Sequence, residues 1–357
     1  MRQKCITALL FFAMLNTVFG QENKTKALTK ARLAVKMMDN GQIDESIVLL
    51  KECQKLDPKN IVYSYELGYA YYQKKEYETA KKYIKKVVKH ENANSGYYQM
   101  LGNIYDLLGN SKKALKTYSD GLKRFPNAGN LYLEKGTIFN MNKQYNAAIN
   151  NYELGIKVDP TFASNYFRAT QMYMSSSDEV WGMLYGEIFM NLEANSDRTV
   201  EVSKLLFDTY KSEIKIINDT SKAVSFSSNI LTLSDLKSMK LPFPAIVYEP
   251  TLLMAIIDVN KIDLASLNRI RTRFVDNYFD SKHNEKYPNI LFDYHKKLKD
   301  SGHFEAYNYW ILMKGDEEAF SEWKEANKEK WDAFIKWFTN NRLVINEEHS
   351  FSRLQYN

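Results

Sequence analysis

The side chains with the clearest capacity for chemistry lie in the stretch DSKHNEKYP (280–288). It places Asp280, His283 and Glu285 close together, and this set of donors could ligate a metal ion. Zinc-binding segments usually carry a tighter signature such as HExxH or CxxC, and neither occurs in the chain. Mixed polar side chains of this kind are typical of a solvated loop, so we expect no metal and no other cofactor.

Nucleophiles also lack a sequence context that would mark them. The chain has no GxSxG, Walker or GxGxxG motif, and neither Ser203 nor Ser225 stands out. His295 and His303 lie in separate segments on either side of Gly302. We therefore expect a protein that is not an enzyme, although a catalytic site assembled from distant residues stays open as an alternative.

Residues 1–20 have the pattern of a signal peptide. MRQK is basic, CITALLFFAML is apolar but too short to span a bilayer, and NTVFG supplies small residues. We expect cleavage between Gly20 and Gln21, export to the periplasm or the secreted space, and a soluble mature chain without a membrane span. Cys5 leaves with this segment, so Cys53 has no partner for an intrachain disulfide and packing must supply the stability.

Composition favours a helical protein of about two domains. The 357 residues include 14 Gly and 7 Pro, which is few, and 25 Tyr and 19 Phe, which is many. The formal net charge of +6 is mild and spread along the chain. The densest basic run, KKYIKKVVKH (81–90), interleaves lysines with apolar residues and reads as a solvated helix face. We expect no nucleic-acid partner.

The elements that position these residues follow a repeat of 34 residues. Gly68, Gly102 and Gly136 are spaced by this period, and small or apolar residues recur around each of them. Each unit reads as two helices joined by a turn, and Pro126 ends one unit because proline cannot continue a helix. A single hairpin cannot bury its own apolar face, so a fixed period predicts hairpins stacked along a continuous core.

The pattern resembles the tetratricopeptide repeat (TPR) family. The residues that carry the resemblance in the opening unit are Tyr98, Leu101, Gly102, Tyr105, Ala114, Tyr118, Gly121 and Pro126. It implies an all-α fold with a solenoid of helical hairpins over residues 27–175, comprising about four repeats and a degenerate fifth. Asn92 replaces an expected proline and Thr170 replaces the fifth glycine, so the pattern is imperfect.

The resemblance also implies that the first helix of each hairpin lines a concave groove for a protein or peptide partner. The residues expected to contact the partner are Tyr65, Tyr69, Tyr72, Gln99, Asn103, Asp106, Leu133, Glu134, Asn140, Phe167, Arg168 and Gln171. One TPR subgroup clamps the terminal carboxylates of its partners. Glu134 stands where that clamp needs an asparagine and would repel a carboxylate, so we expect no such clamp.

The period is lost after residue 175. We expect a helical extension or cap over 176–217, a linker or irregular segment over 218–244, and a helical C-terminal domain over 245–357. A helix over 316–340 would place Trp323, Trp331, Phe334 and Phe338 near one face. This part is similar to the C-terminal halves, of uncharacterised function, of secreted bacterial TPR proteins.

These patterns predict a non-catalytic protein-binding or peptide-binding scaffold of the cell envelope or secreted space. Two alternatives stay open. The C-terminal helices could hold an enzyme site, with the repeats as a docking arm. Self-association is also possible, with the aromatic C-terminal helix of one copy in the groove of another.

Overall fold

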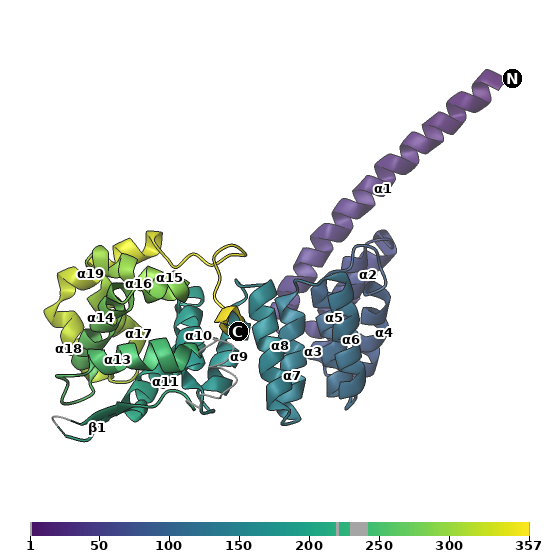
Figure 1. Cartoon of the computed structure of the whole chain (residues 1–357). Coiled ribbons are helices and arrows are strands. Elements are labelled where there is room, and N and C mark those ends of the chain that lie inside the picture. Colours follow the sequence, from purple (N-terminus) through teal and green to yellow (C-terminus); the bar gives the residue numbers. More distant parts are fainter. Residues whose placement is uncertain (1, 219–220, 229–241, 357) are drawn as a thin grey trace. The chain divides into compact units, whose positions relative to one another are not determined.

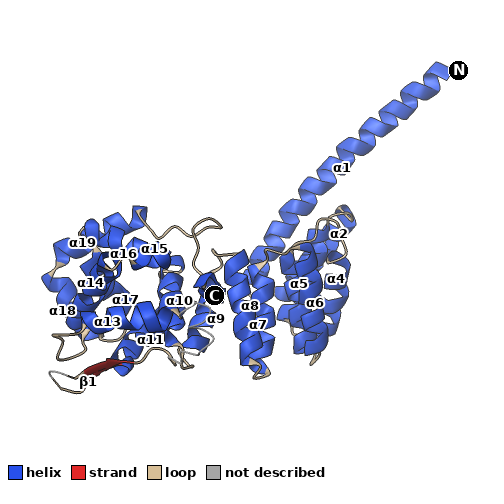
Figure 2. Cartoon of the chain, viewed as in Figure 1, coloured by secondary structure: helices blue, strands red, loops and turns tan. Residues whose placement is uncertain are grey.

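The computed structural model describes residues 2–218, 221–228 and 242–356, and the side chains of residues 2–20 lie outside the described part. Helices dominate the described chain (Figures 1 and 2), which confirms the expected all-α fold class. The chain divides into two compact units, Met1–Pro126 and Asn127–Asn357. The domain boundaries expected from the sequence stay a prediction.

The first unit is a series of helical hairpins. Helix α1 pairs with α2, α3 with α4, and α5 with α6. In chain order the helices are α1 (Arg2–Asp39), α2 (Ile43–Leu56), α3 (Ile61–Gln73), α4 (Tyr77–Val87), α5 (Ser95–Leu107) and α6 (Ser111–Arg124). Asparagine side chains cap α3, α5 and α6, each accepting a backbone N–H of the first turn. No helix among the described residues is long and apolar enough to cross a membrane.

The turns inside the hairpins reuse one backbone conformation every 34 residues. Gly41, Lys75, Gly109 and Lys143 all have a positive φ, between 58° and 80°. Glycine adopts this left-handed region without steric cost, whereas a residue with a Cβ is strained there by about 1–2 kcal/mol. The turn geometry therefore persists even in the two repeats that place a lysine at this position.

The repeated glycines permit close packing across each hairpin. A Cβ added to Gly102 would lie 2.0 Å from Cε1 of Tyr118, and one added to Gly136 would lie 2.4 Å from Cε1 of Tyr152. Both tyrosines are buried on the second helix of their hairpin. At Gly68 the equivalent neighbour is Ile84, whose Cδ1 would lie 2.3 Å from an added Cβ, so the period marks sites where a large side chain lies directly on a helix backbone.

Two apolar clusters form the core of the first unit. One joins α1, α2 and α3, and includes Cys53, whose Sγ donates to the carbonyl of Ala27 at 3.2 Å. The other joins α4 and α5 around Ile84 and Ile104. Burial raises the pKa of the Cys53 thiol, so this cysteine packs as a small apolar residue.

The second unit begins with two further hairpins and continues with helices that do not repeat. Its first part comprises α7 (Gly129–Met141), α8 (Tyr145–Val158), α9 (Ala163–Tyr173), α10 (Glu179–Leu192) and α11 (Asp197–Glu213). Strands β1 (Ile214–Ile216) and β2 (Lys222–Val224) then pair in antiparallel register, with Ile214 opposite Val224. Of the linker expected over 218–244, residues 219–220 and 229–241 lie outside the described residues, and the part between them contains β2.

The remaining elements pack around α14. In chain order they are η1 (Pro244–Tyr248), α13 (Glu249–Ala255), α14 (Leu264–Asp280), α15 (His283–Lys286), α16 (Ile290–Asp300), α17 (Phe304–Leu312), α18 (Glu317–Ala326), α19 (Lys328–Asn340) and η2 (Arg353–Tyr356). Helix α14 contacts α13, α16 and α17.

The single helix expected over 316–340 is two helices. Asp316 caps the first, and Asn327 separates the two with a backbone outside the helical region. The amide of Asn327 donates to the carbonyl of Trp323 at 2.9 Å, which satisfies an oxygen at the end of α18. Phe334 and Phe338 are nevertheless buried, as the expected aromatic face requires.

Candidate functional site

The expected contact residues of the second hairpin are partly packed against neighbouring tyrosines. Tyr65 lies with its ring centroid 4.6 Å from that of Tyr97, and Tyr72 meets Tyr77 edge to face at 5.7 Å. Tyr69 contacts both apolar clusters of the first unit. All three remain partly exposed. They form an aromatic surface whose rings contact neighbouring residues and are still partly exposed to solvent.

Two of the expected contact residues of the third hairpin are already engaged within it. Asn103 Oδ1 accepts a hydrogen bond from the Tyr118 hydroxyl at 2.5 Å. Asp106 accepts one from Ser111 at 2.6 Å. Gln99 is partly exposed and also has an interaction partner. These polar groups brace the hairpin, which the sequence pattern alone did not indicate.

In the second unit, three expected contact residues line one pocket. Asn140, Arg168 and Gln171 lie around a cavity of about 900 Å³ at the turn ends of the α7–α8 and α9–α10 hairpins. Leu133 and Glu134 are partly exposed elsewhere on α7. The structure does not test whether any of these side chains binds a partner, so their role stays a prediction.

Phe167 is buried, unlike Arg168 and Gln171, the other expected contact residues on α9. Its ring centroid lies 5.3 Å from that of Phe189, and the guanidinium of Arg198 lies 5.1 Å from the same ring. Helices α10 and α11 therefore cover it. A side chain in this position supports the pocket wall through packing.

The pocket presents mostly amides and aromatic rings. Asn140, Asn146 and Asn150 are exposed and have no side-chain hydrogen bond within the described part of the chain. Tyr145 beside them is 56% exposed. The other lining residues are Ile149, Tyr152, Met172, Tyr173, Ser175, Ser176, Asp178, Trp181 and Arg353. Amides that both donate and accept, next to an exposed ring, suit a peptide backbone with an apolar side chain.

The charged groups of the pocket differ in how they are compensated. Arg168 donates to the amide oxygen of Gln171 at 2.9 Å and forms no ion pair with another described residue. Gln171 in turn donates to Glu201 at 2.7 Å. Arg353, from the C-terminal segment, is paired with the buried Glu153. The segment that ends the chain thus supplies part of the pocket wall.

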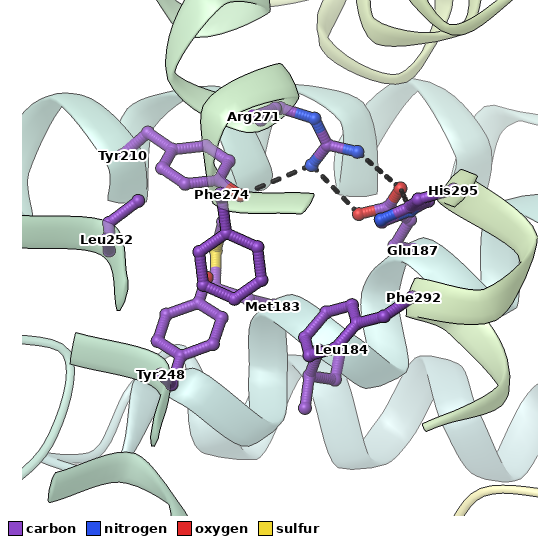
Figure 3. Close-up of a pocket in the computed structure, with 10 residues that line it drawn as sticks. All are labelled: Met183, Leu184, Glu187, Tyr210, Tyr248, Leu252, Arg271, Phe274, Phe292 and His295. Carbon is purple, nitrogen blue, oxygen red and sulfur yellow. Dashed lines mark hydrogen bonds and ion pairs between the residues drawn. The ribbon is translucent and has the colours of Figure 1, made fainter. Parts of the chain in front are cut away.

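A second polar cluster lies inside the core between α10, α14 and α16 (Figure 3). Arg271 donates from Nη1 and Nη2 to the two oxygens of Glu187 at 2.9 and 2.5 Å, and from Nη1 to the Tyr210 hydroxyl at 3.2 Å. His295 Nε2 lies 2.6 Å from Glu187 Oε1, and Arg271 Nε donates to Asn308 at 2.7 Å. The charges are paired, and each charged group makes more than one hydrogen bond.

Electrostatics fix the protonation states of this cluster. Burial alone would raise the pKa of Glu187, but the charge of Arg271 and the contact with His295 outweigh it and hold that pKa below its ordinary value. Burial lowers the pKa of His295 in spite of the carboxylate beside it, with Arg271 adding repulsion. At neutral pH the cluster is an ion pair with a neutral imidazole.

The space within this cluster is small. Its cavity measures about 20 Å³ and is walled by rings such as Tyr248, Phe274 and Phe292 (Figure 3). That is room for about one water molecule. The cluster therefore has the size of a structural core network and not of a substrate site. Among the described residues, no group of three His, Cys, Asp or Glu is arranged to hold a metal ion.

Comparison with known proteins identifies the repeats. Models described as tetratricopeptide repeat match residues 37–104 and residues 95–127. These repeats are tetratricopeptide repeats.

Two curated human proteins resemble part of this chain distantly. RanBP2-like and GRIP domain-containing proteins 3 and 4 of Homo sapiens are each 24% identical to it over 168 residues, which are 47% of this chain. The match spans 10% of the length of these curated relatives.

Solved TPR structures are similarly distant. A thermophilic TPR protein of Thermus thermophilus is 17% identical, with a TM-score of 0.43 over 50% of this chain and 98% of its own. The C-terminal part of a TPR repeat-containing protein from Cytophaga hutchinsonii is 14% identical, with a TM-score of 0.41 over 84% of this chain and 98% of its own.

The TPR pattern did not point to the residues that matter in the second unit outside the repeats. Glu187 is a lone carboxylate inside the apolar run VWGMLYGEIFMNL, and such a residue is a signal for a buried ion pair. Its partner Arg271 stands among other arginines and carries no such mark. The role of Arg353 depends on contacts that no local pattern reveals.

Proposed function

We propose that this chain is a non-catalytic TPR scaffold that binds a protein or peptide segment in the cell envelope or the secreted space. The observation that carries the proposal is the pocket at the turn ends of α7–α8 and α9–α10. It brings Asn140, Arg168 and Gln171 together with two further unbonded amides. Large aromatic contact area combined with adaptable amides is typical of peptide recognition.

A scaffold role agrees with the chemistry of the C-terminal helices. The Glu187 cluster brings ionisable groups together, but it encloses space for about one water and its charged groups are paired with one another. Its geometry therefore favours a structural role over a reaction. TPR arrays in general hold partners, and the aromatic surface of Tyr65, Tyr69 and Tyr72 in the first unit is a separate area proposed for binding.

Export is part of the proposal and rests on the signal-peptide pattern of residues 1–20. Expression of the full sequence in a bacterium with an envelope should give a mature protein that begins at Gln21. N-terminal sequencing of the protein from the periplasmic or secreted fraction measures this directly. A protein that retains residue 1 and stays in the cytoplasm would contradict the export.

The binding proposal is tested by removing amides whose loss cannot disturb the fold. Asn146 and Asn150 lie one helical turn apart on α8 and are exposed. In a pull-down from envelope extract, the double variant Asn146→Ala, Asn150→Ala should retain several-fold less of the proteins that the wild type captures. Each lost hydrogen bond contributes about 1 kcal/mol.

The matched control is Lys112→Ala with Lys116→Ala, which has the same spacing on exposed positions of α6. It should capture the same proteins as the wild type. Thermal unfolding must give equal midpoints for all three proteins. Equal capture by the two double variants would refute binding at the pocket.

A further inference from the structure

The last residues of the chain are bound to the repeat region as a ligand would be. Arg353 Nε and Nη2 donate to the two oxygens of Glu153, each at 2.8 Å. The Tyr173 and Tyr185 hydroxyls donate to the same carboxylate at 2.8 and 3.1 Å. The backbone N–H of Arg353 donates to the Tyr185 hydroxyl at 2.8 Å. The Glu153 carboxylate thus accepts from the guanidinium and from two tyrosine hydroxyls, which hold it in place for the arginine.

Aromatic contacts hold the segment on both sides of this arginine. Phe351 is fully buried, with its ring 5.8 Å from that of Tyr185. Tyr356 stacks on Phe243 with centroids 4.6 Å apart, and its hydroxyl donates to the carbonyl of Pro288 at 2.9 Å. The contacts therefore bind one aromatic residue two positions before the arginine and another three positions after it.

The receiving side is built by residues of α8, α9 and α10. Glu153 is fully buried, so its charge needs a cation or strong donors in every state of the protein. Burial and the adjacent carboxylate raise the pKa of Tyr173, which keeps its hydroxyl protonated as a donor. A bidentate pair with a planar guanidinium is the geometry that distinguishes arginine from lysine.

An exposed stretch leads into the docked segment. Residues 346–349, which precede it, are exposed. Arg353 also lines the pocket proposed for partner binding, so a segment that enters the pocket meets the end of the chain. Departure costs the docked contacts and leaves Glu153 with the hydroxyls of Tyr173 and Tyr185 but without a cation, which a second arginine would supply.

We propose that Glu153, Tyr173 and Tyr185 form an arginine-recognition subsite for a partner segment with an aromatic residue two positions before and three positions after its arginine. The chain's own residues 351–356 occupy the subsite in the free protein. This rests on the proposed function, because it names the segment that the scaffold would recognise. A partner binds by displacing this tail. Competition with the tail therefore lowers the apparent affinity of the partner.

The test uses full-length protein and a fluorescein-labelled peptide NEEHSFSRLQY, the sequence of residues 346–356. Arg353→Gln weakens the tail and vacates the subsite. By fluorescence anisotropy, this variant should bind the peptide at least tenfold more tightly than the wild type. A peptide with glutamine in place of the arginine should bind at least tenfold more weakly. Tyr356→Ala, which loosens the tail without unpairing Glu153, should also bind more tightly than the wild type, and it serves if Arg353→Gln fails to fold.

Equal binding of both peptides, or no binding by folded variants, would overturn the arginine subsite. Light scattering could also show that only residues 351–356 of a second copy enter the arginine subsite. That result would overturn the proposal as well, because the occupant would then be the chain itself. Loss of envelope capture in Asn146→Ala, Asn150→Ala is measured independently. If the wild type still captures envelope proteins at the pocket but binds the arginine and glutamine peptides equally, only the arginine subsite is refuted. The proposed function then stands.

Discussion

The guanidinium of Arg271 and the carboxylate of Glu187 are joined by two hydrogen bonds inside the core, although 84 residues separate them in the chain. Each side chain is only 5% exposed. The pair connects α10, which follows directly on the repeats, with α14 at the centre of the C-terminal helices. Its removal therefore tests how far these two parts of the second unit fold as one.

Loss of one partner should be much more costly than loss of both. Arg271→Met leaves a buried carboxylate and should lower the free energy of unfolding by about 3–5 kcal/mol, whereas Glu187→Leu with Arg271→Met should recover most of that loss. Urea denaturation measures both. Arg273→Met on the same helix removes an exposed pair with Asp258 and should cost less than about 1 kcal/mol. Similar costs for the two arginines would show that the core pair is solvated.

Acid should destabilise the protein through His295. Its folded-state pKa lies below the ordinary 6.5, so the unfolded chain binds more protons in this range and stability falls as pH drops below 6.5. Glu187, with its lowered pKa, adds a second loss below about pH 4.5. Melting temperatures between pH 8 and 4 should show both, and His295→Gln should flatten the first. His349→Gln, at an exposed position, should leave the profile unchanged.

Glu179 should act in the opposite direction. Burial, with a contribution from Glu213, raises its pKa to about 7. Protonated Glu179 is favoured by the folded state, so its contribution is present below about pH 4.5 and is lost as pH rises through 7. Glu179→Gln should therefore stabilise the protein at pH 8 by roughly 1 kcal/mol after solvent screening, and by much less at pH 5. A stabilisation independent of pH would assign the effect to packing.

Lys75 and Lys143 have a left-handed backbone conformation, so substitution at these two positions should stabilise the protein. Lys75→Gly and Lys143→Gly should each raise the free energy of unfolding by about 0.5–1 kcal/mol, because relief of backbone strain exceeds the entropy of an added glycine. Thermal unfolding measures the change. Lys116→Gly in the middle of α6 should instead cost about 1 kcal/mol. Destabilisation at all three positions would mean that the turns are not strained.

The sequence was sufficient for features that depend on local spacing. The period through Gly68, Gly102 and Gly136 predicted the hairpins, because helix pairing needs a small residue at one fixed place in each unit. The same period also aligns Lys75 and Lys143 with turn glycines. Three of the expected contact residues meet in one pocket, since neighbouring hairpins present equivalent positions side by side.

Features that depend on distant contacts could not be predicted. Arg353 meets Glu153 across 200 residues, and neither residue has neighbours that reveal the other. The break at Asn327 was also missed, because the aromatic period continues across it and hides a helix end. Only the structure shows that Arg353 of the docked tail lies at the same pocket as three of the expected contact residues.

The buried Cys53 makes this chain convenient for spectroscopy. Its thiol is fully covered and held against a carbonyl, so reagents such as maleimides do not reach it in the folded protein. In the chain from Gln21 onward, a cysteine introduced at the exposed Asn346 would be the single site that accepts a dye. Detachment of the chain end could then be followed in real time without first removing a native cysteine.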